Sequence, residues 1–195
     1  MKKVKLSALL MAAVFSLALN GQNLIEDGSF ENGVSHWKAP SWKRGDDKLW
    51  LSPTADKTVS QGAGGSNSLK LDWTDKYICY VWYDKEIALN GLTEVELSFW
   101  AKSAGYDGTN IIEIMVNFPE VKDPKKKNVS LGNPWNRTPA DWTFFKQQIK
   151  VPAGATKAKL CIRIHGFKST KGNSWVDNVY FGAVQKNAGD QQGKK

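Results

Sequence analysis

Cysteine is scarce in this chain: only Cys79 and Cys161 occur among its 195 residues. There is no C-x-x-C motif and there are only two histidines, which excludes a metal site built from cysteine and histidine. Each cysteine lies inside an apolar, strand-like run. In an exported protein the two could form one disulfide, or each could remain a buried free thiol, and the sequence leaves both alternatives open.

The motifs of several enzyme classes are also missing. The chain has no G-x-S-x-G element, no phosphate-binding loop and no dinucleotide-binding fingerprint. The segment I-I-E-I-M-V-N-F around Glu113 resembles the nucleophile strand of family 12 glycoside hydrolases. However, no glutamate follows Glu120, and glycoside hydrolysis normally needs two carboxylates that flank the bond. We therefore expect a protein that is not an enzyme, and a glycoside hydrolase with Glu113 as nucleophile is the weaker alternative.

One long apolar run occurs, and it lies at the N-terminus. Lys2, Lys3 and Lys5 precede an apolar stretch over residues 6–19. This stretch is shorter than the roughly 20 residues that a membrane-spanning helix needs, and no stop-transfer pattern follows it. Residues 1–21 therefore read as a signal peptide cleaved near Gly21, and the alternative is an uncleaved N-terminal anchor. The sequence predicts a secreted protein, extracellular or at the cell surface, without a transmembrane segment.

Positive charge exceeds negative charge, but it is not concentrated. The formal net charge is +8, and removal of the three signal-peptide lysines leaves about +5. The remaining basic residues are dispersed, with small clusters at 125–127 and 194–195. A nucleic-acid-binding protein presents a basic face or stripe, so we do not expect a nucleic-acid partner.

Helical periodicity is hard to find after residue 21, whereas alternation with a period of two is frequent. The alternating segments are 68–74, 77–87, 94–102, 110–118, 142–151, 157–165 and 174–181. One apolar and one polar face per strand is typical of antiparallel sheets, and Gly- and Asn-rich turns separate the strands. The sequence predicts an all-β, two-sheet antiparallel β-sandwich over residues 22–185. A polar tail over 186–195 is expected to be disordered.

Aromatic residues are abundant, with nine tryptophans, five tyrosines and eight phenylalanines. Not all of these side chains can be buried in the hydrophobic core. Trp42 and Trp50 lie in an irregular polar stretch, and Trp135 lies in the long segment 119–140. Flat rings stack on the apolar faces of sugars, so these three are candidates for ligand binding. The alternative is that each anchors its loop to the domain.

Five segments in order resemble the carbohydrate-binding modules of families 4, 9 and 22. They read N-L-I-E-D-G-S-F-E-N-G-V-S-H-W (23–37), G-S-N-S-L-K-L (65–71), V-E-L-S-F-W-A-K (95–102), W-T-F-F-K-Q-Q-I-K-V-P-A-G-A-T (142–156) and S-W-V-D-N-V-Y-F-G (174–182). The resemblance implies a jelly roll of the galactose-binding-like type. It also implies a structural Ca²⁺ held by Glu31, Asp177 and main-chain oxygens such as that of Ser29. Without a metal, Glu31 and Asp177 would be a capping or turn pair.

The resemblance further implies a ligand cleft across the outer face of one sheet, built from segments 77–87, 110–118 and 157–165. The non-core positions there are Glu113, Asn117, Arg163 and His165. Tyr77 and Tyr83 join them if Cys79 and Cys161 share that face. The two cysteine-bearing strands are neighbours in this topology, which would permit a cross-strand disulfide. The alternative is an ordinary solvated sheet face.

The function expected from these observations is binding of a plant- or microbe-type polysaccharide or oligosaccharide by a monomeric, secreted, non-catalytic protein. A structural or adhesive cell-surface protein with the same fold is the alternative. That role would need an exposed apolar patch rather than a polar cleft.

Overall fold

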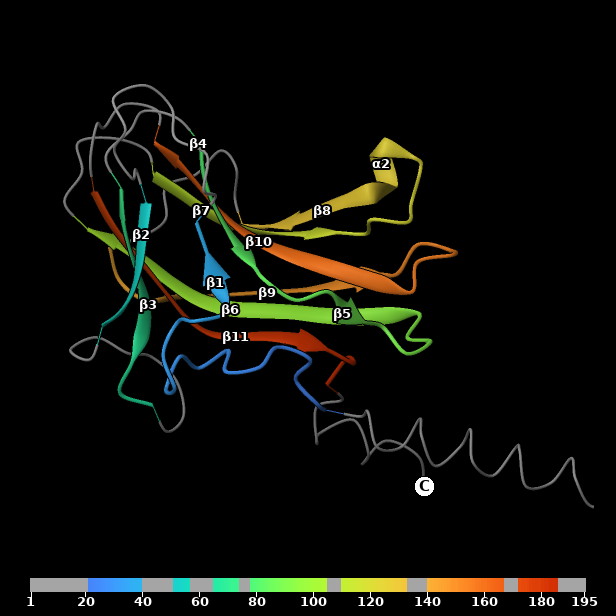
Figure 1. Ribbon diagram of the computed structural model, residues 1–195, viewed down its shortest axis with the longest axis horizontal. Coiled ribbons are helices and arrows are strands. Elements are labelled where there is room, and N and C mark those ends of the chain that lie inside the picture. The colour runs from blue at the N-terminus through green and yellow to red at the C-terminus, as the bar shows by residue number, and fades with distance from the viewer. Residues whose placement is uncertain are drawn as a thin grey trace, which may run out of the picture.

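The chain folds as a sandwich of two antiparallel β-sheets (Figure 1). The computed structural model describes residues 21–39, 51–56, 65–73, 78–104, 110–132, 140–166 and 172–185. No helix within these ranges is long and apolar enough to cross a membrane.

Sheet one has the strand order β1-β4-β10-β7-β8, and β5 also pairs with β10. Its strands are β1 (Trp37–Lys38), β4 (Ile78–Tyr83), β5 (Ile87–Ala88), β7 (Asn110–Asn117), β8 (Asn128–Leu131) and β10 (Lys157–Gly166). Sheet two has the order β2-β3-β11-β6-β9. Its strands are β2 (Leu51–Asp56), β3 (Ser68–Trp73), β6 (Glu94–Ala104), β9 (Thr143–Lys150) and β11 (Gly172–Gly182). A short helix, α2 (Pro124–Lys127), precedes β8.

The core lies between the sheets and is built from alternate residues of each strand. In β10, Leu160, Ile162 and Ile164 are fully buried. In β6 the same alternation buries Leu97 and Phe99. Successive side chains of a strand point to opposite faces, so the intervening residues belong to the outer faces of the sandwich. The predicted all-β sandwich is confirmed.

The N-terminal segment docks along β11, and in Figure 1 it runs as a blue trace beside this strand. Asn23 forms a bridge with Gly182, and the N–H of Leu24 donates to the carbonyl of Phe181 at 2.8 Å. The N–H of Val179 donates to the carbonyl of Gly28 at 2.8 Å. A Cβ at Gly28 would lie 2.0 Å from the Val179 carbonyl oxygen, so only glycine permits this approach.

Two parts of the strand pattern differ from expectation. The predicted strand 77–87 is two strands, β4 and β5, separated by a bend. The segment 119–140, expected as a loop, contains α2 and the short strand β8. β8 has four residues, N-V-S-L, which is too short to show an alternation that distinguishes it from a loop.

The side chain of Asn23 joins the N-terminal segment to β11 through two hydrogen bonds and makes a third within the segment. Its amide donates to the Val179 carbonyl at 2.8 Å, and its oxygen accepts from the N–H groups of Phe181 at 3.0 Å and Ile25 at 3.1 Å. Asn23→Ala leaves these partly buried backbone groups without this partner. We expect a loss of about 1–3 kcal/mol in the free energy of unfolding, measured by urea denaturation. Asn32→Ala, an exposed position in the same segment, is the control and should stay within about 0.5 kcal/mol. An equal loss in both variants would contradict the assigned role of Asn23.

Candidate functional site

The outer face of sheet one gathers polar and aromatic side chains across four strands. Arg163 of β10 lies opposite Tyr80 of β4 on one side and Glu113 of β7 on the other. Directly paired residues of an antiparallel ladder share a face, so these three form one row across the sheet. We call this surface, with the row described next, the sheet-one face.

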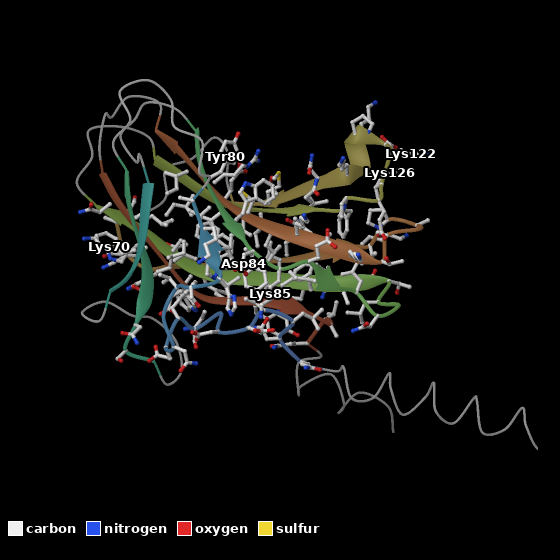
Figure 2. All side chains as sticks on the ribbon, in the orientation of Figure 1. Lys70, Tyr80, Asp84, Lys85, Lys122 and Lys126 are labelled. Atoms are coloured by element: carbon white, nitrogen blue, oxygen red, sulfur yellow. The ribbon has the colours of Figure 1, made fainter. Side chains whose placement is uncertain are left out.

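A second row runs beside the first. Cys161 of β10 lies opposite Trp82 of β4 and Met115 of β7, and Met115 lies opposite Ser130 of β8. Tyr80 and Trp82 are both partly exposed and stand two residues apart on β4, about 7 Å along the strand. Figure 2 shows Tyr80 on the upper side of the molecule, away from Lys70 of β3. Two neighbouring aromatic rings on a polar face suit the stacking of successive sugar rings.

The polar centre of the sheet-one face is the contact of Arg163 with Glu113 and Ser130. The Nη2 of Arg163 contacts Oε1 of Glu113 in an ion pair and donates to Oγ of Ser130 at 2.8 Å. The Glu113 side chain is only 1% exposed, whereas that of Arg163 is 23% exposed. A Cβ at Gly132 would lie 2.7 Å from the Cβ of Glu113, so the residue that follows β8 packs closely on the backbone of β7 at Glu113. The fork of Arg163 is thereby held in one orientation.

One donor of this guanidinium has no acceptor in the part of the chain that the structure describes. The Nε of Arg163 is buried and has no hydrogen-bond partner among the described residues. The rest of the side chain is accessible enough for the guanidinium to donate to a hydroxyl of a ligand. Further along the face, Nδ2 of Asn117 donates to Oδ1 of Asn128 at 2.7 Å, and both side chains are accessible to solvent. The face therefore offers a guanidinium donor and two amides beside two aromatic rings, the combination that recognises sugar hydroxyls and C–H surfaces.

Of the cleft residues predicted from sequence, Glu113 and Arg163 are in contact and Asn117 lies on the same face. The prediction for Tyr83 is wrong, because its side chain is 3% exposed and packs on Trp37 at 5.4 Å between ring centroids. Its hydroxyl accepts from the N–H of Glu26 at 3.1 Å. The β4 sequence I-C-Y-V-W-Y is apolar at every position, so its alternation did not reveal which residues face outward. The structure assigns Tyr80 and Trp82 to the face instead.

Several predicted ligand residues lie outside the part of the chain that the structure describes: Trp42, Trp50, Trp135 and Tyr77. For His165 only the backbone is described, and it pairs with Ile78 and Ile111. Its place beside Arg163 on β10 remains a prediction.

The possible disulfide is not formed. Cys161 is a buried free cysteine. In the ladder of β4 and β10, Cys161 lies opposite Trp82 and Cys79 lies opposite Ile164. The two cysteines are thus three positions apart along the strands, about 10 Å, beyond the roughly 4.4–6.8 Å that a disulfide allows between Cα atoms. Burial raises the pKa of the Cys161 thiol to about 12, so it stays protonated and unreactive.

The predicted calcium ligands lie around the start of β3. The carboxylate of Glu31 accepts from the N–H groups of Ser66 and Asn67, both at 2.9 Å. Both hydrogen bonds lower the pKa of Glu31 below its usual value, and the bond from Asn67 has the larger effect. The carboxylate is therefore ionised at neutral pH. Register pairs Val176 of β11 with Leu69 of β3, which sets the next residue, Asp177, beside Ser68 and close to this cluster.

This cluster contains oxygens that fit a calcium ion. Among the described residues, Oδ1 of Asn67 and Oγ of Ser68 are buried side-chain oxygens without a hydrogen-bond partner. The Asp177 side chain is 1% exposed, and its Oδ1 accepts from the N–H of Asn178 at 2.7 Å. Two carboxylates with amide and hydroxyl oxygens are the hard donors that Ca²⁺ takes. The hydroxyl of Ser29, another predicted ligand residue, donates to Asp27 at 3.4 Å. Within the described ranges, no three acidic, histidine or cysteine side chains lie together in a group that could hold a metal.

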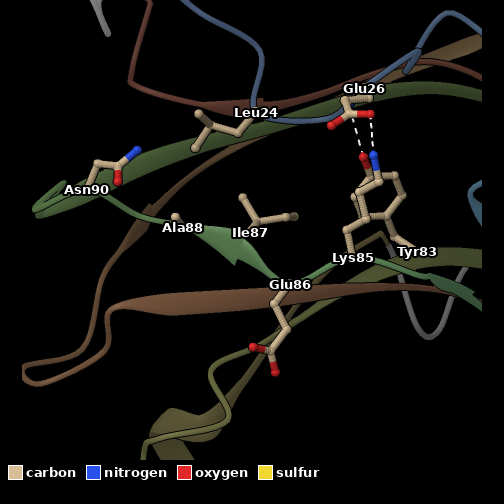
Figure 3. A pocket seen from close by; sticks show the side chains of 8 residues that line it. All are labelled: Leu24, Glu26, Tyr83, Lys85, Glu86, Ile87, Ala88 and Asn90. Atoms are coloured by element: carbon tan, nitrogen blue, oxygen red, sulfur yellow. Dashed lines mark hydrogen bonds and ion pairs between the residues drawn. The ribbon is translucent and has the colours of Figure 1, made fainter.

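A small pocket lies apart from these sites, between the N-terminal segment and the β4–β5 connection (Figure 3). Its volume is about 180 Å³, and its lining residues are Leu24, Glu26, Tyr83, Lys85, Glu86, Ile87, Ala88 and Asn90. Glu26 and Lys85 form an ion pair at its rim. The hydrogen bond and charge of Lys85 lower the pKa of Glu26, and Glu26 raises that of Lys85.

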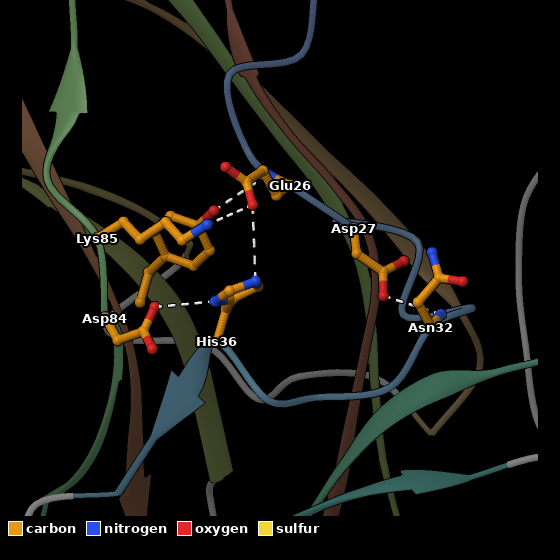
Figure 4. A network of polar contacts seen from close by, with 7 residues as sticks. Glu26, Asp27, Asn32, His36, Asp84 and Lys85 are labelled. Atoms are coloured by element: carbon orange, nitrogen blue, oxygen red, sulfur yellow. Dashed lines mark hydrogen bonds and ion pairs between the residues drawn. The ribbon is translucent and has the colours of Figure 1, made fainter.

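The pocket belongs to a polar network that fastens the N-terminal segment to β4 (Figure 4). His36 lies between Asp84, 3.1 Å from Nδ1 to Oδ1, and Glu26, 3.6 Å from Nε2 to Oε2. The backbone N–H of Asp84 also donates to the carbonyl of His36 at 2.8 Å. These contacts join two segments that are far apart in sequence. The network therefore has a structural role: it holds the N-terminal segment against the end of β4.

The fold is shared with known carbohydrate-binding modules. A family 16 carbohydrate-binding module matches 82% of this chain and 99% of its own, with 22% identity and a TM-score of 0.55. The tandem CBM22 modules of Paenibacillus barcinonensis Xyn10C match with 18% identity and a TM-score of 0.59, covering 85% of this chain and 50% of that one. The enzymatically active domain of tailspike protein 4 of bacteriophage CBA120 matches with 19% identity and a TM-score of 0.61, covering 83% of this chain and 21% of that one.

At these identities the comparisons show the fold. The predicted jelly-roll sandwich of the carbohydrate-binding-module type is confirmed. No family model matches the sequence, and no curated protein is significantly similar to it.

The state of the cysteines can be measured directly. In denaturant without reductant, thiol titration should find two free thiols per chain, because the register keeps Cys79 and Cys161 apart. In a folded Cys79→Ser variant, Cys161 should react far more slowly than after unfolding. A pKa raised from 9.0 to about 12 lowers the thiolate fraction near pH 8 by roughly a hundredfold or more. Finding no titratable thiol in the unfolded wild-type chain would show that the disulfide exists.

Proposed function

We propose that the protein is a secreted, monomeric, non-catalytic carbohydrate-binding protein whose ligand lies across the sheet-one face. The observation that carries this proposal is the placement of Tyr80 and Trp82 beside the fixed guanidinium of Arg163 on one polar face. The ligand class is a plant- or microbe-type polysaccharide. The fold shared with carbohydrate-binding modules supports the same class.

In this proposal each group has a separate task. Tyr80 and Trp82 stack on the C–H faces of neighbouring sugar units. The accessible part of the Arg163 guanidinium donates to a sugar hydroxyl, while Glu113 and Ser130 hold the group in place. Asn117 and Asn128 provide amide donors and acceptors at the edge of the face. Rigid donors lose little conformational entropy when the ligand binds, which favours affinity.

Two features of Glu113 argue for this positioning role and against hydrolysis. Its carboxylate is 1% exposed and paired with Arg163, so a sugar carbon could not approach it without displacing the pair. It is also the only acidic residue within the sequences of β4, β7, β8 and β10. A glycosidase needs a second carboxylate at about 5–10 Å.

The binding proposal is tested by affinity electrophoresis or calorimetry with soluble β-glucan, xylan, mannan and galactan. Trp82→Ala should weaken binding to the preferred polymer by about three- to tenfold, since aromatic stacking contributes roughly 0.5–1.5 kcal/mol. Arg163→Gln should weaken it similarly through loss of a charged donor. The control is Phe144→Ala, which removes an exposed aromatic ring from the other sheet. Wild-type protein that binds no polymer, or Trp82→Ala and Arg163→Gln proteins that bind normally, would contradict the proposal.

We also propose a structural Ca²⁺ held by Glu31, Asp177, Asn67 and Ser68. When bound, the ion would link the N-terminal segment to β3 and β11. At a hundredfold excess over its Kd, Ca²⁺ should stabilise the fold by about 2.7 kcal/mol, which corresponds to a rise of about 5–10 °C in Tm. Asp177→Asn should abolish this rise, whereas Asp141→Asn, at an exposed position, should retain it. Identical melting of the wild-type protein with Ca²⁺ and with chelator would remove the metal from the account.

A further inference from the structure

The outer face of sheet two carries a second group of aromatic side chains, which we call the aromatic–lysine stripe. It consists of Trp100 and Lys102 on β6, Trp142 immediately before β9, Phe144 on β9, and Trp175 on β11. Register places Trp100 opposite Phe144, and Lys102 opposite Trp175. The neighbouring pair Phe99 and Phe145 stacks on the core side, so the stripe lies on the outer face.

Contacts within the stripe are close and specific. The rings of Trp100 and Phe144 lie 5.1 Å apart between centroids, tilted by 43°. The Nζ of Lys102 lies 4.9 Å from the ring centroid of Trp175 and 5.3 Å from that of Trp142. Its ammonium group is therefore placed over two indole faces.

The exposure and the charge of the stripe differ from those of a structural cluster. Phe144 is 47% exposed, and among the described residues it is the one large hydrophobic side chain classed as exposed. Lys102 contacts the two indoles and no carboxylate within the described ranges. Further along β9, Lys146 forms an ion pair with Glu96 at 2.8 Å, so lysine–carboxylate pairing is available on this face but not used at Lys102.

We infer that the aromatic–lysine stripe is a second carbohydrate-binding surface and that its ligand is an acidic polysaccharide, one whose sugar units carry carboxylates. The C–H face of a uronate unit can stack on Phe144 and Trp100. Its carboxylate can pair with the ammonium of Lys102, which the indoles hold in place. The net charge of about +5 that remains after removal of the signal-peptide lysines favours the approach of a polyanion. This inference does not depend on the proposed function, because the two surfaces lie on opposite sheets.

A purely structural role explains only part of these observations. β9 is an edge strand of sheet two, and a cross-strand aromatic pair such as Trp100 and Phe144 stabilises pairing at an edge. That role does not require a half-exposed ring or a lysine seated between two tryptophans. It predicts that loss of Phe144 lowers stability and leaves ligand binding unchanged.

The experiment measures binding of polygalacturonate and alginate, and of the neutral polymers, by affinity electrophoresis at low and high salt. The proteins are wild type, Phe144→Ala, Lys102→Met, Trp82→Ala and Lys122→Gln. Lys122→Gln removes the same charge from an exposed position at the end of the molecule opposite Lys70 (Figure 2). Urea unfolding of every variant confirms that it is folded.

The inference predicts that wild-type protein binds at least one acidic polymer and that added salt weakens this binding. Phe144→Ala and Lys102→Met should weaken it by about three- to tenfold, with Trp82→Ala and Lys122→Gln close to wild type. Binding of neutral polymers should show the reverse dependence, on Trp82 and not on Phe144. The two proposals can therefore fail separately.

Four outcomes would overturn the inference. Wild-type protein could bind no acidic polymer. Phe144→Ala and Lys102→Met could bind like wild type, which leaves the structural role. Lys122→Gln could lose as much affinity as Lys102→Met, which indicates attraction by net charge alone. Wild-type protein could self-associate in a way that Phe144→Ala abolishes, which makes the stripe a contact between copies of the chain.

Discussion

The burial of Leu160, Ile162 and Ile164 in β10 is the constraint on which the site depends. β10 is the central strand of sheet one, with β4 on one side and β7 on the other. Because side chains alternate along a strand, burial of these three residues places Cys161 and Arg163 on the outer face. A slip of one residue would bury the guanidinium and expose three aliphatic side chains, so the register is strongly specified.

The ion pair between Arg163 and Glu113 follows from that register. Two charges removed from water recover their desolvation cost only with good geometry, and apolar replacements of such pairs are often as stable. Stability is thus a weak explanation for this pair. Positioning is a better one, because the carboxylate and the Ser130 hydroxyl together hold the guanidinium while its Nε remains without a partner among the described residues.

The sequence predicted the sandwich, most of its strands and the faces of β6, β7 and β10, because polar and apolar residues alternate clearly there. It placed Glu113, Asn117 and Arg163 on one outer face correctly. It could not orient β4, where every residue is apolar, and so it selected Tyr83 in place of Tyr80 and Trp82. It also missed Ser130 and Asn128, since β8 is too short to show a period. The disulfide depended on register, which a single sequence does not contain.

The two outer faces of the sandwich differ in a way that composition alone did not reveal. Sheet one presents a guanidinium, amides and two aromatic rings, which suits hydroxyl-rich sugars. Sheet two presents a lysine framed by indoles beside an exposed phenylalanine, which suits a sugar that carries charge. Fold similarity does not distinguish these surfaces, because the same jelly roll can carry different sites.

The central claim is that sugar binds on the sheet-one face through Trp82 and Arg163. The most direct measurement is nuclear magnetic resonance of the protein labelled with ¹⁵N, titrated with an oligosaccharide of the preferred neutral polymer. The account predicts that the indole N–H of Trp82 and the Nε–H of Arg163 shift together in a saturable way, while the indole signals of Trp142 and Trp175 stay in place. Shifts confined to Trp142 and Trp175, or no shift of Trp82 and Arg163 at saturation, would contradict it.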